Sequence, residues 1–408
     1  MPSVVFYFQV HQPYRVRRLS HFTDQTDIFD SEKNGKIMQK VAAKCYLPTN
    51  KVMLELIENY EGRFRISYSI SGVAIDQMKK YSPETLDSFM ALADTGCVEF
   101  LAETYYHSLS AIYDEQEFQE QVKEQQKLVL DFFGQKSEVF RNTELIYNDH
   151  IGHLAARMGF KGVIAEGADD IIQWRSPNYV YLVNGSVQSG RATRLLLKNY
   201  RLSDDIAFRF SNRDWKEFPL TADKFAAWVH QVSGAGEIVN LFMDYETFGE
   251  HQWESTGIFE FLKYLPDAVM SKPDWDFLTP KEAIARYQPA AEMKFERLTS
   301  WADADRDLTA WRGNQMQVRA LKRIYEIAAR VHATGNAYLL DKWRKLQTSD
   351  HFYYMCTKWF ADGDVHAYFS PYDSPYDAFI YYMNSLKNFE AEVERALIGQ
   401  TSENNQFA

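Results

Sequence analysis

Two carboxylic acids, a hundred positions apart in the chain, each follow an apolar segment. Glu144 comes after Val139 to Asn142, and Asp244 comes after Glu237 to Met243. Glycoside hydrolysis uses a pair of carboxyl groups that flank the bond to be broken. A separation of about 5–5.5 Å leads to retention of configuration, and about 6.5–9.5 Å leads to inversion. The alternative interpretation is structural: Glu144 pairs with Arg141 or another cation, and Asp244 caps the following helix.

Other polar and aromatic side chains also stand where apolar segments end. The first segment ends in His11 and Gln12, and the third carries Glu99 and continues into Tyr105 and His107. We interpret His11 either as a donor to a substrate hydroxyl or as a buried histidine bonded to the backbone. If the segments are parallel strands of a barrel, all these positions converge on one rim.

The stretch after Asp244 is rich in ionisable groups. Glu246 is expected to raise the pKa of Asp244 as a negative neighbour, and His251 is expected to contact substrate. Histidines and carboxylates on a rim also suit a divalent metal, which stays open as an alternative. The sequence has no HxH or HxxxH spacing near these positions, and His150 and His153 stand at a helix start. We therefore predict no metal and no other cofactor.

Several tryptophans lie in polar surroundings. An aromatic ring can stack on the apolar face of a sugar, but tryptophan is also an ordinary core residue. Trp174 is one such candidate, and Trp301 and Trp311 flank a charged segment that contains Asp305. We interpret this segment either as a solvated helix start or as the lip of a sugar subsite.

The elements that must position these residues alternate along the first two-thirds of the chain. Apolar segments predict strands over Val4 to Val10, Phe64 to Ile70, Val98 to Ala102, Val139 to Asn142, Gly162 to Ala165 and Glu237 to Met243, with further candidates near Leu195 and Phe208. Helical patterns separate them, as in Pro83 to Asp94 and Glu115 to Phe133. Strands that alternate with helices predict a parallel sheet, and the polar strand ends favour a barrel of about seven strands.

Beyond about Pro289 the sequence predicts helices alone, over Met316 to Val331, Ala337 to Leu346 and Ala378 to Leu397. The fold class is therefore α/β: an irregular seven-stranded (β/α) barrel followed by an all-α C-terminal region. We expect a catalytic barrel over residues 1–288, a helical domain over 289–400 that contributes to the cleft, and a flexible tail over 401–408.

Composition limits the classes of binding partner and the cellular compartment that we expect. The 408 residues carry a formal net charge of −11, which disfavours nucleic acid and anionic membranes. The three cysteines are widely spaced, and the N-terminal residues lack a signal-peptide pattern, so we expect the cytoplasm. No stretch has about 18 uninterrupted apolar residues, so no membrane span is expected. The sequence predicts no oligomeric state.

The chain resembles glycoside hydrolase family 57, the α-amylase-like group that acts on α-glucans. All five short signatures of that family have counterparts here, in order: HQP at His11, "GCVEFLAETYYHSL" from Gly96, "FRNTELIYND" from Phe140, "FMDYETFGEH" from Phe242 and "SWADADRDLTAW" from Ser300. The second departs mildly from the family, which often has Gln at the position of Cys97. The resemblance extends over nearly the whole chain, including Ser349 to Phe379.

The resemblance implies a seven-stranded imperfect (β/α) barrel with helical segments after it, retention of configuration and no catalytic metal. It gives Glu144 the role of nucleophile and Asp244 that of general acid/base. Arg141 or His11 is expected to keep Glu144 charged, and Glu144 and Glu246 to raise the pKa of Asp244. We predict that substrate contacts come from His11, Gln12, Glu99, Tyr105, His107, Trp174, Glu246, Phe248, His251, Trp301 and Asp305.

The predicted function is that of an intracellular α-amylase that cleaves α-1,4 bonds of glycogen, starch or maltodextrin by double displacement. The first alternative is 4-α-glucan transfer or branching at the same site, where a sugar hydroxyl replaces water. A metal-dependent carbohydrate deacetylase and a non-catalytic glucan-binding protein are further alternatives.

Overall fold

The computed structural model describes residues 2–188, 190–358 and 368–406. Seven parallel strands form its centre: β1 (Ser3–Val10), β2 (Ile66–Ile70), β3 (Val98–Phe100), β4 (Val139–Arg141), β5 (Gly162–Glu166), β7 (Arg194–Lys198) and β8 (Ile238–Asp244). These strands are buried nearly throughout, as expected where helices cover a parallel sheet. The predicted barrel with about seven strands is confirmed.

The strands belong to two five-stranded sheets that curve toward each other. One has the order β3-β2-β1-β8, with the short β9 (Asp276–Phe277) beside β1. The other has the order β10-β6-β7-β5-β4, in which β6 (Tyr181–Val183) is antiparallel to β7 and β10 (Glu292–Met293) pairs with β6. The predicted sheet therefore continues past Pro289, through a two-residue strand that carries no sequence signal of its own.

Single contacts join the two sheets at both seams. Ala102, just after β3, bridges to Phe140 of β4, with backbone hydrogen bonds of 3.0 Å and 2.8 Å to the neighbouring residues. At the other seam the backbone N–H of Asn199 donates to the carbonyl of Asn240 at 2.9 Å. The barrel is thus irregular because its sheet is not continuously hydrogen-bonded around the circumference.

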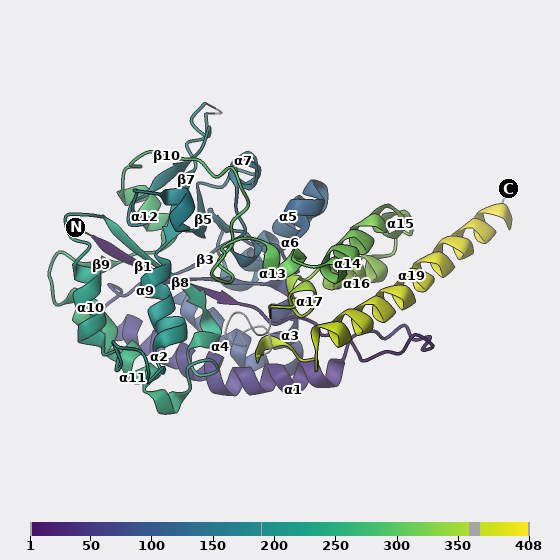
Figure 1. The fold of residues 1–408 in the computed structure, drawn as a ribbon, viewed down its shortest axis with the longest axis horizontal. Helices are drawn as coiled ribbons and strands as arrows, with labels where there is room; N and C mark the ends of the chain where they lie inside the picture. The colour runs from purple at the N-terminus through teal and green to yellow at the C-terminus, as the bar shows by residue number, and fades with distance from the viewer. Residues whose placement is uncertain (1, 189, 359–367, 407–408) are drawn as a thin grey trace.

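Helices between the strands cover the outside of the barrel (Figure 1). They are α1 (Ser31–Val41), η1 (Ala42–Tyr46), α2 (Leu47–Asn59), α3 (Gly72–Tyr81), α4 (Pro83–Asp94), α5 (Ser110–Tyr113), α6 (Glu115–Phe133), α7 (Asp149–Arg157), α8 (Asp169–Ile172), α9 (Tyr200–Asp204), η3 (Asp205–Arg209), α10 (Ala222–His230), α11 (Ile258–Met270) and α12 (Pro280–Arg286). Short 3₁₀ turns follow several strands: η2 (Thr143–Leu145), η4 (Tyr245–Thr247) and η5 (Glu254–Thr256). The prediction of a strand near Phe208 is wrong, because that segment continues α9 as one π-helical turn.

The C-terminal region is helical and lies beside the barrel, on the right in Figure 1. It contains α13 (Thr309–Arg312), α14 (Gln315–Glu326), α15 (Ala328–Ala333), α16 (Ala337–Leu346), α17 (Ser349–Tyr353) and α19 (Pro375–Gln406). The last helix extends through residues 401–406, where the sequence suggests a tail. Residues 359–367, part of the resembling stretch, lie outside the described residues.

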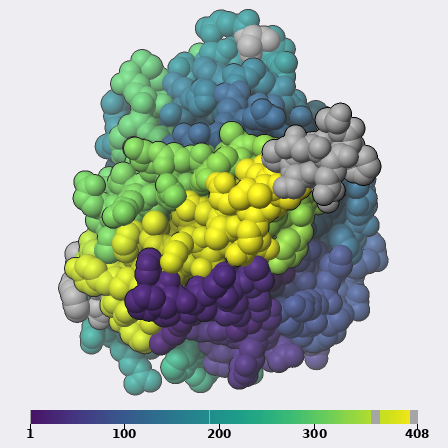
Figure 2. All heavy atoms as spheres, turned by 90° about the vertical axis from the view of Figure 1, so that its right-hand side faces the viewer, coloured from purple at the N-terminus to yellow at the C-terminus, as the bar shows by residue number. Residues whose placement is uncertain are grey.

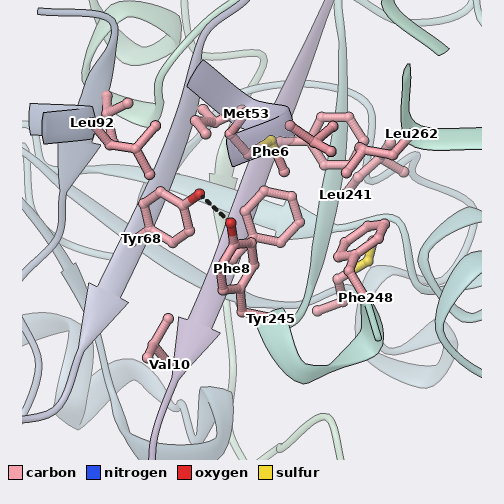
Figure 3. Packing of buried hydrophobic residues seen from close by; sticks show 14 of the residues in the cluster. Phe6, Phe8, Val10, Met53, Tyr68, Leu92, Leu241, Tyr245, Phe248 and Leu262 are labelled. Carbon is pink, nitrogen blue, oxygen red and sulfur yellow. Dashed lines mark hydrogen bonds between the residues drawn. The ribbon is translucent and has the colours of Figure 1, made fainter. Parts of the chain in front are cut away.

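Two hydrophobic clusters make most of the core. One fills the space between β1, β2, β8 and helices such as α2, α4 and α11. Figure 3 shows its centre, where the Tyr68 hydroxyl donates to that of Tyr245 at 3.1 Å and Phe8 lies beside both rings. The second cluster joins β4, β5 and β7 to the C-terminal helices through residues such as Trp311 and Trp343. The helical region is therefore packed onto the barrel by shared apolar side chains.

The loop between β1 and α1 packs against α19, so segments near the two ends of the described chain lie side by side. Figure 2 shows this segment against α19 on one face of the molecule. Asn384 and Lys387 of α19 donate to the carbonyls of Leu19 and His21 at 2.7 Å and 2.9 Å. Among the described residues, no helix combines the length and apolar character that a membrane crossing requires.

Candidate active site

A cavity of about 580 Å³ opens at the C-terminal ends of the barrel strands. Both predicted catalytic residues, Glu144 and Asp244, lie in its wall. Six of the predicted substrate-contact residues line it as well: His11, Gln12, His107, Glu246, His251 and Trp301. The helical region supplies the opposite wall through residues such as Asp303, Asp350 and Tyr353.

Glu144 is presented by a strained turn after β4. Its backbone has φ 57° and ψ 25°, a left-handed conformation that a residue with a Cβ rarely adopts. The neighbouring chain holds it there: Trp301 N–H donates to the carbonyl of Glu144 at 3.2 Å, and Tyr147 and Thr299 form an antiparallel bridge. His107, Asp303 and Arg306 in the same cavity also have positive φ, between 50° and 54°. Such strain concentrates at functional sites.

Three donors from three parts of the chain hold the Glu144 carboxylate. Trp301 Nε1–H donates to Oε2 at 2.8 Å, and the Ser349 hydroxyl donates to Oε1 at 3.1 Å. The third donor is His107 Nε2, 3.3 Å from Oε1. Burial by itself raises the pKa of Glu144, but His107 and the charge of Arg141 outweigh it, so the pKa lies below its ordinary value. Glu144 is therefore held as an anion.

His107 is held as a cation between two carboxylates. Its Nδ1 lies 2.9 Å from Oε2 of the fully buried Glu103, on the side away from Glu144. Burial lowers the pKa of His107, but the hydrogen bonds to Glu103 and Glu144 raise it overall to about 9. His11 stacks on this ring with a centroid distance of 4.0 Å. Burial and the His107 charge lower the pKa of His11, so it remains neutral.

Both nitrogens of His11 are already bonded to protein groups. Nδ1 lies 2.7 Å from the Ser71 hydroxyl, and Nε2 lies 3.0 Å from Asp350 Oδ2. The expected contribution of Arg141 to the charge of Glu144 is present, whereas the expected contribution of His11 is made by His107. His11 instead orients Asp350 and the ring of His107.

Trp301 connects the charged groups beneath the cavity. Its ring centroid lies 4.9 Å from the guanidinium carbon of Arg141 and 5.4 Å from Lys198 Nζ. Both cations favour the negative face of an indole ring. Arg141 is completely buried, and its ion pair is with Glu103 at 3.8 Å. The alternative in which Arg141 pairs directly with Glu144 is therefore not what this geometry shows.

Asp244 differs from Glu144 in its surroundings. It is the last residue of β8, and its side chain does not cap the following turn. In the described part of the chain no group hydrogen-bonds to its carboxyl group, which faces the cavity. Burial, followed by the charge of Glu144, raises the pKa of Asp244 to about 6, against Arg141, Lys198 and His107. Between the two pKa values Glu144 is ionised while Asp244 is protonated, which is the pattern of a nucleophile and an acid.

Glu246 lies two residues further and has a still higher pKa. Burial and the charge of Asp244 raise the pKa of Glu246 to about 8. Oε1 accepts from the Tyr46 hydroxyl and from Gln12 Nε2, the latter at 3.3 Å. Asp244 and Glu246 are thus negative neighbours that repel each other, and this repulsion contributes to the raised pKa of Glu246.

Five predicted contact residues lie outside the cavity lining. Phe248 is part of the core in Figure 3, and Tyr105 is buried with its hydroxyl on Asp76 at 3.0 Å. Glu99 accepts the N–H of Lys281 at 2.8 Å, and α12 begins beside the N-terminal ends of the strands. Trp174 is 84% exposed, and Asp305 forms an ion pair with Lys358 at 2.6 Å.

The structure adds cavity residues for which the sequence assigns no role. Asp350 pairs with His11, and Lys198, Asp204 and Arg306 form a charged network at distances of 3.1 Å and 2.9 Å. Ser349 and Asp350 belong to the resembling stretch, but at a helix start they look like ordinary capping residues. Lys198 and Asp204 come from an irregular region without a clear pattern.

The alternative of a metal site requires a cluster of side chains that can act as ligands. Over residues 2–188, 190–358 and 368–406, no group of three or more His, Cys, Asp or Glu side chains could hold a metal ion. His11 and His107 are instead bonded to carboxylates, and His11 also to the Ser71 hydroxyl.

The family model described as glycosyl hydrolase family 57 matches residues 5–296. A protein of Methanocaldococcus jannaschii named "Putative alpha-amylase" is 42% identical over 408 residues, which covers 97% of this chain and 85% of that protein.

Solved structures show the same fold at low identity. A GH57-type branching enzyme from Pyrococcus horikoshii has a TM-score of 0.69 at 15% identity, covering 95% of this chain and 88% of that one. An α-amylase from Thermotoga maritima has a TM-score of 0.63 at 12% identity, covering 97% and 93%.

Proposed function

Because the chain belongs to glycosyl hydrolase family 57 and is a glycoside hydrolase, we propose that it cleaves α-1,4 bonds of glycogen, starch or maltodextrin with retention of configuration. The observation that carries the proposal is the contrast between two carboxyl groups in one cavity. Glu144 is held as an anion by three donors, whereas Asp244 has a pKa raised to about 6. The name of the relative from Methanocaldococcus jannaschii supports the substrate class.

In the first step, a Glu144 oxygen attacks the anomeric carbon while the bond to the leaving oxygen breaks. Asp244 gives its proton to that oxygen, so the departing chain leaves as an alcohol. The hydrogen bonds to Glu144 keep the nucleophile ionised and fix its orientation. The product of this step is a covalent glycosyl-enzyme.

In the second step, Asp244 acts as a base. Its carboxylate takes a proton from water while the water oxygen attacks the anomeric carbon and Glu144 leaves. Loss of the Glu144 charge in the covalent intermediate lowers the pKa of Asp244, since that charge is one of the causes that raise it. The same residue thus serves as acid and then as base, without movement of any other group.

The remaining cavity residues supply substrate contacts in this proposal. Gln12, Glu246 and His251 lie in the wall where a sugar chain would pass, with Tyr353 and Phe369 from the helical region. The barrel over residues 1–288 carries the reacting groups, and the region 289–400 completes the cleft. We further propose that the enzyme acts in the cytoplasm, as its three widely spaced cysteines suggest.

Hydrolysis of maltoheptaose by purified protein tests the proposal. Glu144→Gln and Asp244→Asn should each lower kcat by about 10²–10⁴-fold or more while thermal unfolding stays near wild type. Proton NMR during the first minutes should show the α-anomer of the new reducing end. Turnover by Glu144→Gln at the wild-type rate, or initial release of the β-anomer, would contradict the mechanism.

The same reaction separates hydrolysis from transfer. The glycosyl-enzyme can be resolved by water or by a sugar hydroxyl, and we propose water. Chromatography should therefore show only products shorter than maltoheptaose. Chains longer than the input would replace this proposal with 4-α-glucan transfer or branching.

A further inference from the structure

The hydrogen bonds around Glu246 have a direction that is fixed by Arg15. A guanidinium group only donates, so the Gln12 amide oxygen, 3.2 Å from Arg15 Nη2, is the acceptor. The amide nitrogen of Gln12 therefore faces Glu246 and donates to Oε1 at 3.3 Å. The hydroxyl oxygen of Tyr46 accepts from the same nitrogen at 3.5 Å, and its proton goes to Oε1.

This chain of bonds leaves the two oxygens of Glu246 unequal. Oε1 accepts from two donors and has no room for a proton of its own. Among the described residues, no side chain hydrogen-bonds to Oε2. Glu246 lies in the cavity wall and is 7% exposed. A proton on this carboxyl group is therefore assigned to Oε2.

The charged and titratable groups around Glu246 favour that proton. Burial is the main cause and the negative charge of Asp244 adds to it, so the pKa of Glu246 rises to about 8. From η1, Cys45 and Tyr46 face it as neutral groups, since their own pKa values are raised far above the ordinary values by burial. The nearby lysines, Lys40 and Lys44, form ion pairs with Glu250 instead.

We propose that Glu246 works as a neutral carboxylic acid that donates a hydrogen bond from Oε2 to a hydroxyl oxygen of the sugar unit bound beside Asp244. Gln12 and Arg15 are positioning residues that keep Oε1 an acceptor. The inference rests on the proposed glucan hydrolase function and adds the protonation state and donor direction of one sugar contact.

Binding of maltoheptaose in the Glu144→Gln background tests this without turnover. Kd is measured by calorimetry from pH 7 to 9 for this variant and for its combinations with Glu246→Gln and Glu246→Leu. At pH 7 the Leu variant should bind about tenfold more weakly, because one hydrogen bond is lost. The Gln variant should lose no more than about threefold, because its amide N–H₂ also donates.

The pH dependence isolates the proton on Glu246. Affinity should fall as the pH rises through about 8 when Glu246 is present. The fall should be weaker in the Gln variant, in which His107, with a pKa raised to about 9, is the cavity group that still titrates. Replacing Gln12 with Leu removes a donor that lowers the pKa of Glu246, so the fall should move to higher pH. A purely structural role for Gln12 would leave the position of that fall unchanged.

Equal affinities of the Gln and Leu variants, or affinity that is constant or rises from pH 7 to 9 with Glu246 present, would overturn the inference. Thermal unfolding of each variant near that of the Glu144→Gln protein excludes misfolding as the cause. Failure of the proposed function looks different: wild-type protein then shows no turnover, and the Glu144→Gln protein does not bind maltoheptaose.

Discussion

Trp301→Phe should shift the acidic limb of the pH–activity profile to higher pH. The substitution keeps an aromatic ring but removes the indole N–H that lies 2.8 Å from Glu144 Oε2. A hydrogen bond to a charged group contributes about 1.5–3 kcal/mol. Loss of this bond should therefore destabilise the ionised carboxylate by about that amount and raise the pKa of Glu144. The nucleophile then remains protonated at a pH where the wild-type enzyme is active.

The assay is kcat/KM for maltoheptaose between pH 3 and 9, with Trp311→Phe as the matched control. Trp311 is also buried in the helical region, but its indole nitrogen has no hydrogen-bond partner among the residues that the structure describes. The control should leave the acidic limb in place even if the protein becomes less stable. An acidic limb that does not move in Trp301→Phe, or that moves equally in both variants, would refute the conclusion that the Trp301 hydrogen bond keeps Glu144 ionised.

Three further outcomes follow from the same geometry. Wild-type kcat/KM should decline above about pH 6, because Asp244, whose pKa is raised to about 6, must be protonated to act as the acid; a constant rate from pH 6 to 8 would contradict this. His107→Asn should raise the pKa of Glu144 by more than Trp301→Phe does, since a positive charge is lost with the hydrogen bond; the acidic limb in the same assay measures it. Gly249→Ala should lower the melting temperature more than Gly96→Ala, because a Cβ at Gly249 would lie 2.0 Å from a backbone carbonyl, whereas one at Gly96 meets nothing within 4 Å; equal losses would disprove the clash.

The strand ends were predictable because they combine two simple signals. A predicted strand followed within two residues by a carboxylate points to Glu144 and Asp244, and parallel strands bring such positions to one rim. The same sequence signal wrongly assigns substrate contacts to residues that lie near a strand end but not directly after it. Phe248 follows Asp244 closely, but the turn after β8 directs its ring into the core beside Phe8. Glu99 lies within β3 and not after it, and its carboxylate accepts the backbone N–H of Lys281 in α12.

The partners contributed by the helical region had no comparable signal. Ser349 bonds Glu144 and Asp350 bonds His11, but both stand in the first turn of a short helix, where polar residues are common. Their role depends on how α17 packs against the barrel, which is a long-range property. The protonation states of His107 and Glu246 likewise depend on neighbours from distant segments, since burial and nearby charge set each pKa.

The hydrogen bonds that hold the Glu144 carboxylate also have a consequence for the synthesis of the enzyme. Its donors Trp301 and Ser349 follow Glu144 by 157 and 205 residues along the chain. During synthesis the N-terminal part emerges first, so Glu144 leaves the ribosome long before α17 has been translated. A nascent or prematurely terminated chain therefore lacks two of the hydrogen-bond donors that favour the ionised form of Glu144 and fix its orientation. The hydrogen bonds that hold this carboxylate therefore form only after nearly the whole polypeptide has been synthesised.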